Sequence, residues 1–478
     1  MGKRIHAFTD DALGNLDATG VAEAIAKKEI SVEESIEAAI HRSEKVNPAL
    51  NAIVMKLYDD ARNYELQNKG GIFYGVPTYF KDTDNLKGYP TQMGTGAFTA
   101  KVAKRNSRFA DQFLSSGVVH LGKTTLPEFG LMCSTENERW AVTRNPWNTD
   151  YTPGGSSSGS AALVASGAVP IATGNDGGGS IRIPASICGL VGLKPTRHRI
   201  HGVHGTDKMP IEIVHQGVLT RSVRDTAAFY GGMEQFYRNP KLPELGHITE
   251  PGKKRLRIAF LQNLPKGSQG WQDPDTSRVQ QDTARLLESL GHHVDEIPTP
   301  IDVDSMVEYF LDYYGFLSYM STHWGRMVYK AKVDKSQLEP FTLGLAKRFK
   351  KNPFRLRKSV RELRKLGAEC SKVFDTYDVV MTPVLSHKTP KIGHFSPQLS
   401  YEEVTQRIID FATYTGLYNI TGEPAISLPM GTDSDDMPLG VHLAAPYGQD
   451  RRLIELAYEL EAAQPWRTLA TAGAEEMA

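Results

Sequence analysis

Apolar residues recur at helical spacing in the first part of the chain. Residues 17–28 and 31–46 carry an apolar side chain at every third or fourth position, which is typical of amphipathic helices. Ser31 and Glu34 stand three residues apart at the start of the second segment, and this pair fits a capping box. We therefore expect residues 1–65 to form a helical segment that packs on the rest of the molecule.

Short apolar runs then alternate with helical segments over most of the remaining sequence. The runs have the length of buried strands, and they cover residues 74–80, 118–121, 169–173, 256–261, 293–297, 379–382 and 425–428. Helical periodicity occurs at 275–290, between two of these runs, and at 451–463 near the end. Strands that alternate with helices predict an α/β fold.

No fixed-period repeat and no long linker divides the chain, so we expect one large domain over residues 66–470. Two stretches differ from their surroundings. Residues 309–324 contain seven aromatic side chains, which more often belong to a core than to a pocket. Residues 347–365 hold ten Lys or Arg against the single acid Glu362, and we interpret them as a solvated helix face.

The charge balance argues against several classes of partner. The 478 residues include 55 basic and 55 acidic side chains, so the net charge gives no argument for a nucleic-acid partner. No stretch approaches the ~20 apolar residues of a membrane helix, and the first ten residues lack the apolar core of a signal peptide. Three widely spaced cysteines suit reduced thiols. We expect a cytoplasmic protein with no membrane or nucleic-acid partner.

Two serines set among glycines carry the clearest chemical signal. Ser156 lies in a Gly-Gly-Ser-Ser-Ser-Gly-Ser run, and Ser180 follows three consecutive glycines at 177–179. A serine hydroxyl is a poor nucleophile unless a base lies beside it. Glycines let backbone N–H groups crowd around a developing negative charge. The second cluster follows the apolar run 169–173, and it predicts an attacking oxygen together with donors for an oxyanion.

Lys81 is the candidate base. It directly follows the apolar run that ends at Phe80, so we expect it at the inner end of a buried strand. Desolvation at such a place lowers the pKa of a lysine toward that of a usable base. The alternative is a lysine that reaches the surface at the strand end, which is the commoner case because buried lysines are rare.

Other interpretations of the two serine clusters stay open on these residues alone. A Gly/Ser run can be a flexible loop or a phosphate cradle, although the lysine of the P-loop consensus is missing. Residues 155–159 also match the nucleophile-elbow pattern with Ser157 at its centre. An elbow must follow a buried strand, whereas residues 145–153 are typical of a loop. For 176–182 the alternative is a tight glycine turn with a capping serine.

The order of these blocks resembles the amidase signature family of serine hydrolases. The matching blocks are, in chain order, 75–77 with Lys81 and Asp82, 145–148, 153–162, 174–185, 188–196 and 421–429. Within the family, three features look most like the branch that contains 6-aminohexanoate cyclic dimer hydrolase: the pair Asn175 and Asp176, the block 145–148 and the C-terminal blocks. The resemblance implies a single α/β domain with a central mixed β-sheet flanked by helices. It also implies a variable helical and aromatic insertion at about 300–370.

The family works by a Ser-cisSer-Lys triad, and the resemblance assigns its members by motif position. Ser180 stands at the nucleophile, Ser156 at the serine reached across a cis peptide bond, and Lys81 at the base. Neutral Lys81 would take a proton from Ser156. Ser156 would in turn take the proton of Ser180 as that oxygen attacks a carbonyl.

The resemblance also implies the remaining parts of the site. The oxyanion donors are expected among the N–H groups of Gly177, Gly178, Gly179 and Ser180. Gly130 aligns with a stretch that lines the substrate cleft and would leave room near the scissile bond, an ordinary loop being the alternative. Ser158 stands where the family usually has a glycine, and its hydroxyl either adds a hydrogen bond or crowds the turn. Lys194 belongs to a structural block of the family, outside the triad.

The implied activity is hydrolysis of carbon–nitrogen bonds in small or linear amides, with esters and carbamates as further substrates. One alternative is the glutamine-hydrolysing subunit of a tRNA amidotransferase, a branch that typically has Ser-Asp in place of Asn175-Asp176. Another is a non-catalytic amide-binding relative. None of the fourteen histidines falls in a metal-binding pattern, so we expect no metal and no cofactor. The expected partner is a small-molecule amide, and a homodimer stays open.

Overall fold

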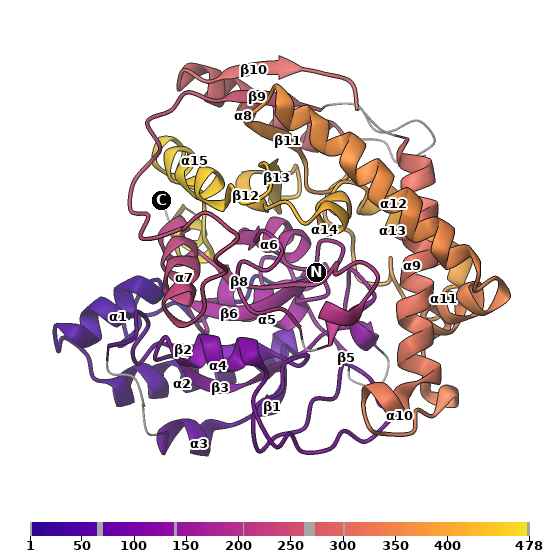
Figure 1. Ribbon diagram of the computed structural model, residues 1–478. Coiled ribbons are helices and arrows are strands. Elements are labelled where there is room, and N and C mark those ends of the chain that lie inside the picture. The colour runs from indigo at the N-terminus through magenta and orange to yellow at the C-terminus, as the bar shows by residue number, and fades with distance from the viewer. Residues whose placement is uncertain are drawn as a thin grey trace.

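One mixed β-sheet runs through the molecule, and the helices pack against it (Figure 1). The computed structural model describes residues 2–64, 70–137, 141–203, 205–261, 273–299 and 302–475. Within them, eleven strands follow from edge to edge in the order β1 (Ile53–Lys56), β3 (Val119–Thr124), β2 (Pro77–Lys81), β6 (Ile171–Asp176), β8 (His215–Thr220), β7 (Val191–Lys194), β12 (Ala425–Thr432), β13 (Pro438–Ala444), β11 (Val379–Pro383), β9 (Arg257–Phe260) and β10 (His293–Glu296). The short strands β4 (Glu136–Asn137) and β5 (Ala141–Val142) pair separately.

The direction of two central strands decides where polar side chains meet. β2 runs parallel to both of its neighbours, β3 and β6. The next strand, β8, is antiparallel to β6, so the sheet is mixed. Because parallel strands end at the same edge of a sheet, the last residues of β2 and β6 lie close together. Lys81 ends β2, and Asp176 ends β6.

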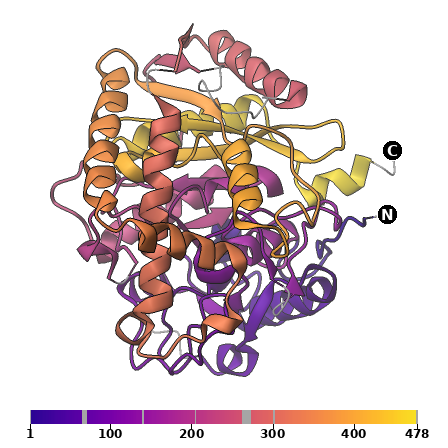
Figure 2. The ribbon, with the colours of Figure 1, turned by 90° about the vertical axis from the view of Figure 1, so that its right-hand side faces the viewer.

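The helices are distributed along the whole chain. In order they are α1 (Ala18–Ala26), α2 (Val32–Leu50), α3 (Tyr58–Arg62), α4 (Arg108–Leu114), α5 (Ser158–Ala165), α6 (Arg182–Cys188), α7 (Val223–Phe236), α8 (Pro274–Ser289), α9 (Val303–His323), α10 (Gly325–Val328), α11 (Pro340–Lys351), α12 (Arg355–Ser371), α13 (Tyr401–Phe411), α14 (Leu417–Thr421), α15 (Asp450–Ala463) and α16 (Leu469–Glu475). Figure 2 shows α9, α11 and α12 lying together on one side of the molecule.

Local sequence determines where these helices begin. The predicted capping box at the start of α2 is confirmed: the Ser31 hydroxyl accepts from the Glu34 N–H at 3.1 Å, and the Ser31 N–H donates to the Glu34 carboxylate at 2.7 Å. At α8 the Asp273 carboxylate accepts two N–H groups of the first turn, and Pro274 occupies the first helical position, where a missing N–H costs nothing.

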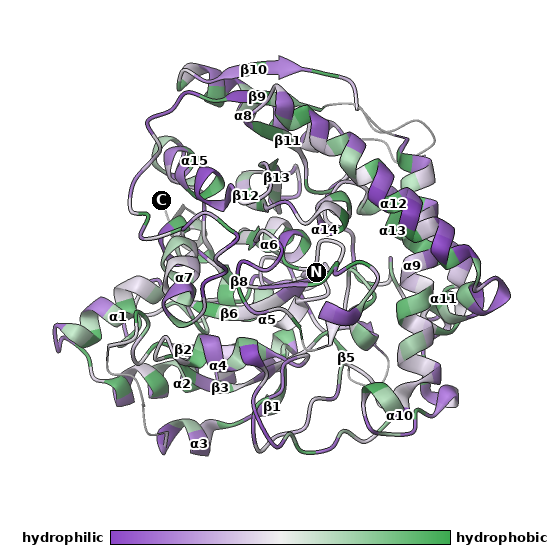
Figure 3. Cartoon of the chain, viewed as in Figure 1, coloured by the Kyte–Doolittle hydropathy of each residue, from purple (hydrophilic) through white to green (hydrophobic). Residues whose placement is uncertain are grey.

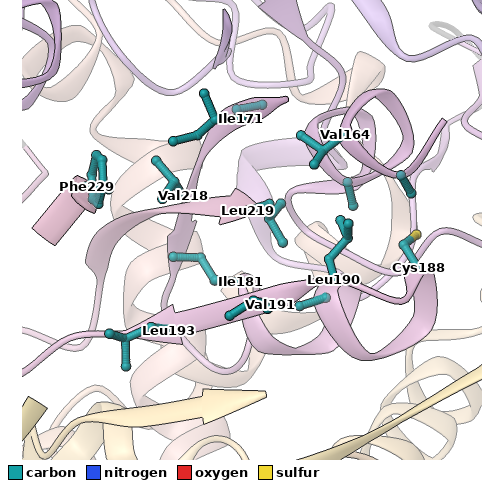
Figure 4. Packing of buried hydrophobic residues seen from close by; sticks show 14 of the residues in the cluster. Val164, Ile171, Ile181, Cys188, Leu190, Val191, Leu193, Val218, Leu219 and Phe229 are labelled. Atoms are coloured by element: carbon teal, nitrogen blue, oxygen red, sulfur yellow. The ribbon is translucent and has the colours of Figure 1, made fainter. Parts of the chain in front are cut away.

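The core lies around the middle strands of the sheet. Figure 4 shows apolar side chains of β6, β7 and β8 packing between α5, α6 and α7. Ile171, Leu219 and Phe229 are each 0 % exposed. Every residue of β6 and β8 is buried, including polar ones, which is typical of strands covered on both faces. The site described below is therefore built on strands that are buried along their whole length.

The fold class expected from the sequence is confirmed, and each predicted strand corresponds to an observed one. The predicted start of the first of these strands is wrong. Residues 74–76 form a turn, because the Val76 N–H donates to the Phe73 carbonyl at 3.0 Å and Gly75 adopts a positive φ of 78°. The strands β1, β4, β5, β7, β8 and β13 were not predicted. Glycine or polar residues interrupt the apolar runs of β7, β8 and β13, whereas β1, β4 and β5 are very short.

The two unusual stretches of the sequence lie in α9, α11 and α12. Tyr313 of α9 belongs to the core, whereas other aromatic residues of that helix line a pocket. Hydrophilic residues dominate the surface of α12, as expected for a solvated face (Figure 3). Two of the basic residues differ from that expectation, because Arg348 and Arg355 form ion pairs with the Asp312 carboxylate on α9. No helix in the described part of the chain is long and apolar enough to cross a membrane.

A matched pair of leucine variants tests this description of the core. Leu219 is fully buried in β8, whereas Leu16 is 37 % exposed. We expect Leu219→Ala to lower the free energy of unfolding by about 2–5 kcal/mol, because it leaves a cavity between packed side chains. Leu16→Ala is expected to change it by about 0.5 kcal/mol or less. Urea unfolding followed by tryptophan fluorescence measures both, and equal losses would contradict this assignment of the core.

Candidate active site

The ends of β2 and β6 bring Lys81 beside Asn175 and Asp176. The side chain of Lys81 is 0 % exposed, and its backbone N–H donates to the Thr173 hydroxyl at 2.8 Å. This contact ties the end of β2 to the neighbouring strand. The lysine therefore does not reach the surface, and the interpretation of Lys81 as a buried strand-end residue holds.

Uncharged oxygens surround the amine of Lys81. Its Nζ lies 2.7 Å from Asn175 Oδ1 and 2.8 Å from Ser156 Oγ. Ser157 Oγ is slightly farther away, at 3.1 Å, and the carbonyl oxygen of Asn175 lies at 3.5 Å. No carboxylate is in hydrogen-bond contact with this amine within the described residues.

Burial is the main reason why the amine of Lys81 loses its proton readily. Desolvation penalises the charged form and lowers the pKa of Lys81 to about 7. The carboxylates of Asp176 and Asp84 oppose this shift, because negative charge nearby favours the protonated amine. The result is a lysine that is substantially neutral near physiological pH.

The loop that carries Ser156 requires small residues. The peptide bond between Gly155 and Ser156 is cis. A side chain at 155 would lie 2.7 Å from the carbonyl carbon of Cys133, so the neighbouring backbone excludes any residue larger than glycine. A Cβ at Gly130 would come 3.3 Å from the hydroxyl of Ser156. The absence of a side chain at Gly130 leaves room beside the hydroxyl of Ser156, which is itself buried.

The next two serines stabilise the same turn. Ser157 precedes α5, and its hydroxyl donates to the carbonyl oxygen of Ser180 at 2.6 Å, which links the two serine clusters. The hydroxyl of Ser158 donates to the Gly154 carbonyl at 2.5 Å and accepts from the Thr135 hydroxyl at 2.7 Å. The departure from the usual glycine at 158 thus adds hydrogen bonds and does not crowd the turn.

The carboxylate of Asp176 holds the glycine loop that leads to Ser180. Its oxygens accept from the N–H of Gly179 at 2.8 Å and of Ile181 at 3.2 Å. The N–H of Gly179 is therefore committed to Asp176, which corrects the expectation that it binds an oxyanion. Within the described residues, the hydroxyl of Ser180 has no hydrogen-bond partner, and the same is true of the N–H groups of Gly177, Gly178 and Ser180.

A buried ion pair fixes this carboxylate. Arg182 and Asp176 are both fully buried, and Arg182 Nη2 lies 2.8 Å from Asp176 Oδ1. Burial alone would raise the pKa of Asp176, but the charge and hydrogen bonds of Arg182 and the amide of Asn419 hold it well below its usual range. Asp176 is thus a permanent anion whose hydrogen bonds position the loop.

An apolar pocket opens beside Ser180. It is lined by residues of the loops around Gly130 and Gly178 together with apolar side chains of α9 and α13, and no lining residue is charged. The tyrosine Tyr314 of α9 also lines it, and a Cβ at Gly178 would lie 2.7 Å from the Tyr314 hydroxyl. A residue larger than glycine at 178 would therefore require the Tyr314 side chain to shift.

Sequence analysis missed several of these residues. The motif contains Asn175 and Arg182, but nothing in the pattern says that one contacts Lys81 and the other neutralises Asp176. Tyr314 lies over one hundred residues away from the loop, in a stretch interpreted mainly as core. Lys194 lies on β7, where its amine donates to the Pro195 carbonyl at 2.8 Å. Among the described residues no group of His, Cys, Asp or Glu side chains is arranged to hold a metal ion.

Comparisons with known proteins show which family and fold this chain resembles. A family model described as "Amidase" matches residues 34–454. A Mycobacterium leprae protein described as "Putative amidase AmiC" is 46 % identical over 464 residues, which cover 97 % of this chain and 98 % of that protein. The 6-aminohexanoate-cyclic-dimer hydrolase of Pseudomonas sp. is 33 % identical over 94 % of this chain and 95 % of its own length. A solved structure of 6-aminohexanoate cyclic dimer hydrolase with its substrate has a TM-score of 0.84 and 30 % identity, over 94 % of this chain and 97 % of the other.

Removing Arg182 tests the role of the buried ion pair. We expect Arg182→Met to lower the free energy of unfolding by about 3–5 kcal/mol, because Asp176 would be left as an uncompensated buried charge. Arg278 provides the matched control, since it is 51 % exposed and pairs with Asp275 at 3.2 Å. Arg278→Met is expected to cost about 1 kcal/mol or less. Thermal and urea unfolding measure both variants, and comparable small losses would show that the pair does not hold the loop.

Proposed function

The chain belongs to the amidase signature family of hydrolases that act on amides, and we propose that it cleaves them through an acyl-enzyme on Ser180. The observation that carries the proposal is the buried contact of 2.8 Å between Lys81 Nζ and Ser156 Oγ, beside the pocket that contains Ser180. A serine nucleophile needs a base that removes its proton. Here the neutral amine of Lys81 would act as that base through the hydroxyl of Ser156.

The reaction begins with proton transfer along the three side chains. Ser180 Oγ attacks the carbonyl carbon, its proton passes to Ser156 Oγ, and the proton of Ser156 passes to Lys81 Nζ. Collapse of the tetrahedral intermediate breaks the carbon–nitrogen bond, and the same relay returns a proton to the departing amine. Water then attacks the ester on Ser180, with its proton taken and returned by the relay, so that acid and free Ser180 are released.

Backbone N–H groups of the glycine loop stabilise the oxyanion in this proposal. The donors that have no partner among the described residues are those of Gly177, Gly178 and Ser180, whereas Gly179 contributes indirectly through its hydrogen bond to Asp176. Donors fixed in place before the reaction act more strongly than solvent, because they need no reorganisation as charge develops.

The pocket favours uncharged substrates. Because no lining residue is charged, a charged group on the substrate would be desolvated there without a partner. We infer that the substrates are small or linear amides with an apolar acyl or aryl portion. The similarity to the 6-aminohexanoate-cyclic-dimer hydrolase of Pseudomonas sp. supports the apolar part of this inference, since the carbon chain of the 6-aminohexanoate in that protein's name is apolar.

Probe labelling tests the nucleophile. A fluorophosphonate serine probe is expected to label the protein at one serine, and Ser180→Ala should abolish both labelling and amide hydrolysis. Ser160→Ala is the matched control, because Ser160 is also buried and its hydroxyl pairs with Thr124 at 2.8 Å, outside the relay. Peptide mapping that finds the label on Ser157 would contradict the assignment and favour the nucleophile-elbow hypothesis.

The pH dependence of the rate tests Lys81 as the base. Only the neutral amine accepts a proton, so the rate should rise with pH through a midpoint near the pKa of Lys81, which is about 7. The midpoint belongs to the coupled relay of Lys81 and Ser156 and not to one group. Initial rates across a pH series with an uncharged aryl amide measure it. A rate that falls as the pH rises through this range would exclude a neutral lysine base.

A comparison of amide and ester substrates tests whether the relay delivers a proton to the leaving group. An amide nitrogen leaves poorly unless it is protonated, whereas an activated ester needs little help. We therefore expect measurable esterase activity on Ser180, and we expect Lys81→Ala to lower amide hydrolysis by about 10² to 10⁴ but ester hydrolysis by less. A matched amide and ester with the same acyl group, both limited by chemistry, provide the comparison. Equal losses of amide and ester hydrolysis would mean that Lys81 only activates Ser180 and does not deliver a proton to the leaving group.

A further inference from the structure

The contacts of Lys81 determine the direction of its hydrogen bonds. A neutral lysine amine has two N–H bonds and one lone pair, whereas the protonated form has three donors and no acceptor. Three side-chain oxygens lie within 3.1 Å of Lys81 Nζ, from Asn175, Ser156 and Ser157. For the neutral amine, two of these oxygens must accept an N–H, and the third group must donate to the lone pair.

Two of the three oxygens can only accept. The side-chain oxygen of Asn175 has no hydrogen to donate. Ser157 has one, but its hydroxyl donates to the Ser180 carbonyl at 2.6 Å. Ser156 differs from both, because Lys81 is the only hydrogen-bond partner of its hydroxyl within the described residues. The two N–H bonds of Lys81 therefore point to Asn175 and Ser157, and its lone pair faces the Ser156 hydroxyl.

We propose that Asn175 is a positioning residue of the proton relay, which accepts one N–H bond of Lys81 and thereby turns the lone pair of Lys81 toward Ser156. The inference rests on the proposed function, because the direction of the lone pair matters only if Ser156 passes its proton to Lys81. With that proton facing the amine, the lone pairs of the Ser156 oxygen are free to accept the proton of Ser180.

Thr83 fixes the orientation of the Asn175 amide. The amide nitrogen of Asn175 donates to the Thr83 hydroxyl at 2.7 Å, so its oxygen is held on the side of Lys81. A serine or threonine at 175 would present a hydroxyl, which can donate as well as accept, and the direction of the Lys81 hydrogen bonds would then not be fixed. The amide oxygen of Asn175 in this orientation can only accept a hydrogen bond from Lys81.

The same arrangement accommodates the protonated lysine after the transfer. The three N–H bonds of the ammonium then have three acceptors, in Asn175, Ser156 and Ser157. Two carboxylates influence this amine from outside its contact shell, Asp176 at the end of β6 and Asp84 after β2. Asp82 also lies close to the strand end, but it is paired with Lys123 at 3.0 Å. None of these charges replaces the direct contact made by Asn175.

Substitutions at 175 and 83 test the proposal. Asn175→Leu removes the acceptor at nearly constant size, and we expect kcat to fall about 10- to 100-fold with little change in KM, because the lone pair is no longer aimed. Thr83→Val should lower kcat less than Asn175→Leu does. Thr83→Ser keeps the hydroxyl and should therefore have the kcat of the wild-type protein. Asn47→Leu is the control for loss of a polar contact, because the side-chain oxygen of Asn47 accepts two backbone N–H groups outside the site. It should reduce stability with unchanged kcat per folded protein.

Asn175→Asp gives a readout that a purely structural role would not move. A carboxylate at the position of the amide favours the charged lysine, so the low-pH limb of the rate should shift upward by about one to three pH units. NMR titration of ε-¹³C-labelled lysine, with Lys81 assigned by the loss of its signal in Lys81→Met, should show the same rise in the pKa of Lys81.

The outcomes separate this inference from the proposed function. If the wild-type protein neither hydrolyses amides nor reacts with the fluorophosphonate probe at Ser180, the proposed function fails. The relay then fails with it, and the NMR titration still shows whether Asn175 contacts the Lys81 amine. If the wild-type protein is active, but Asn175→Leu keeps kcat within about twofold and Asn175→Asp leaves both the pH limb and the pKa of Lys81 unchanged, the role of Asn175 is overturned.

Discussion

The structure depends on an amine that is buried among oxygens without a carboxylate in contact. A charged lysine at such a place costs several kcal/mol unless an anion pairs with it. Lys81 has three side-chain acceptors but no ion-pair partner within the described residues, and the neutral form is correspondingly favoured. The neighbouring loops maintain this condition. They supply hydroxyl and amide groups to Lys81, and they pair the nearby carboxylate of Asp176 with Arg182.

The negative charge of Asp176 illustrates how this separation is achieved. Asp176 lies one residue after Asn175, at the end of the strand beside β2, so its carboxylate could have paired with Lys81. It pairs instead with Arg182, and it also accepts from the N–H groups of Gly179 and Ile181 and from the side-chain amide of Asn419. The fixed charge thus shapes the loop before Ser180, and its influence on the amine is limited to longer range.

The sequence predicted the candidate residues of this site but not the contacts among them. Serine and glycine clusters after a strand, and a lysine at the end of an apolar run, are local patterns, so Lys81, Ser156 and Ser180 were identifiable as candidates. The contact of Asn175 with Lys81 depends on the parallel register of β2 and β6, which no local pattern encodes. Tyr314 reaches the glycine loop only through the packing of α9. The commitment of the Gly179 N–H to Asp176 likewise follows from three-dimensional geometry.

Neutron diffraction from deuterium-exchanged crystals, grown at a pH above the pKa of Lys81, tests the central claim most directly. The account predicts two deuterons on Lys81 Nζ, directed at Asn175 and Ser157, and one deuteron on Ser156 directed at Lys81. Three deuterons on the amine would mean that the lysine is charged in the resting protein. A deuteron on Lys81 directed at Ser156, with none returned from the serine, would contradict the proposed direction of proton transfer.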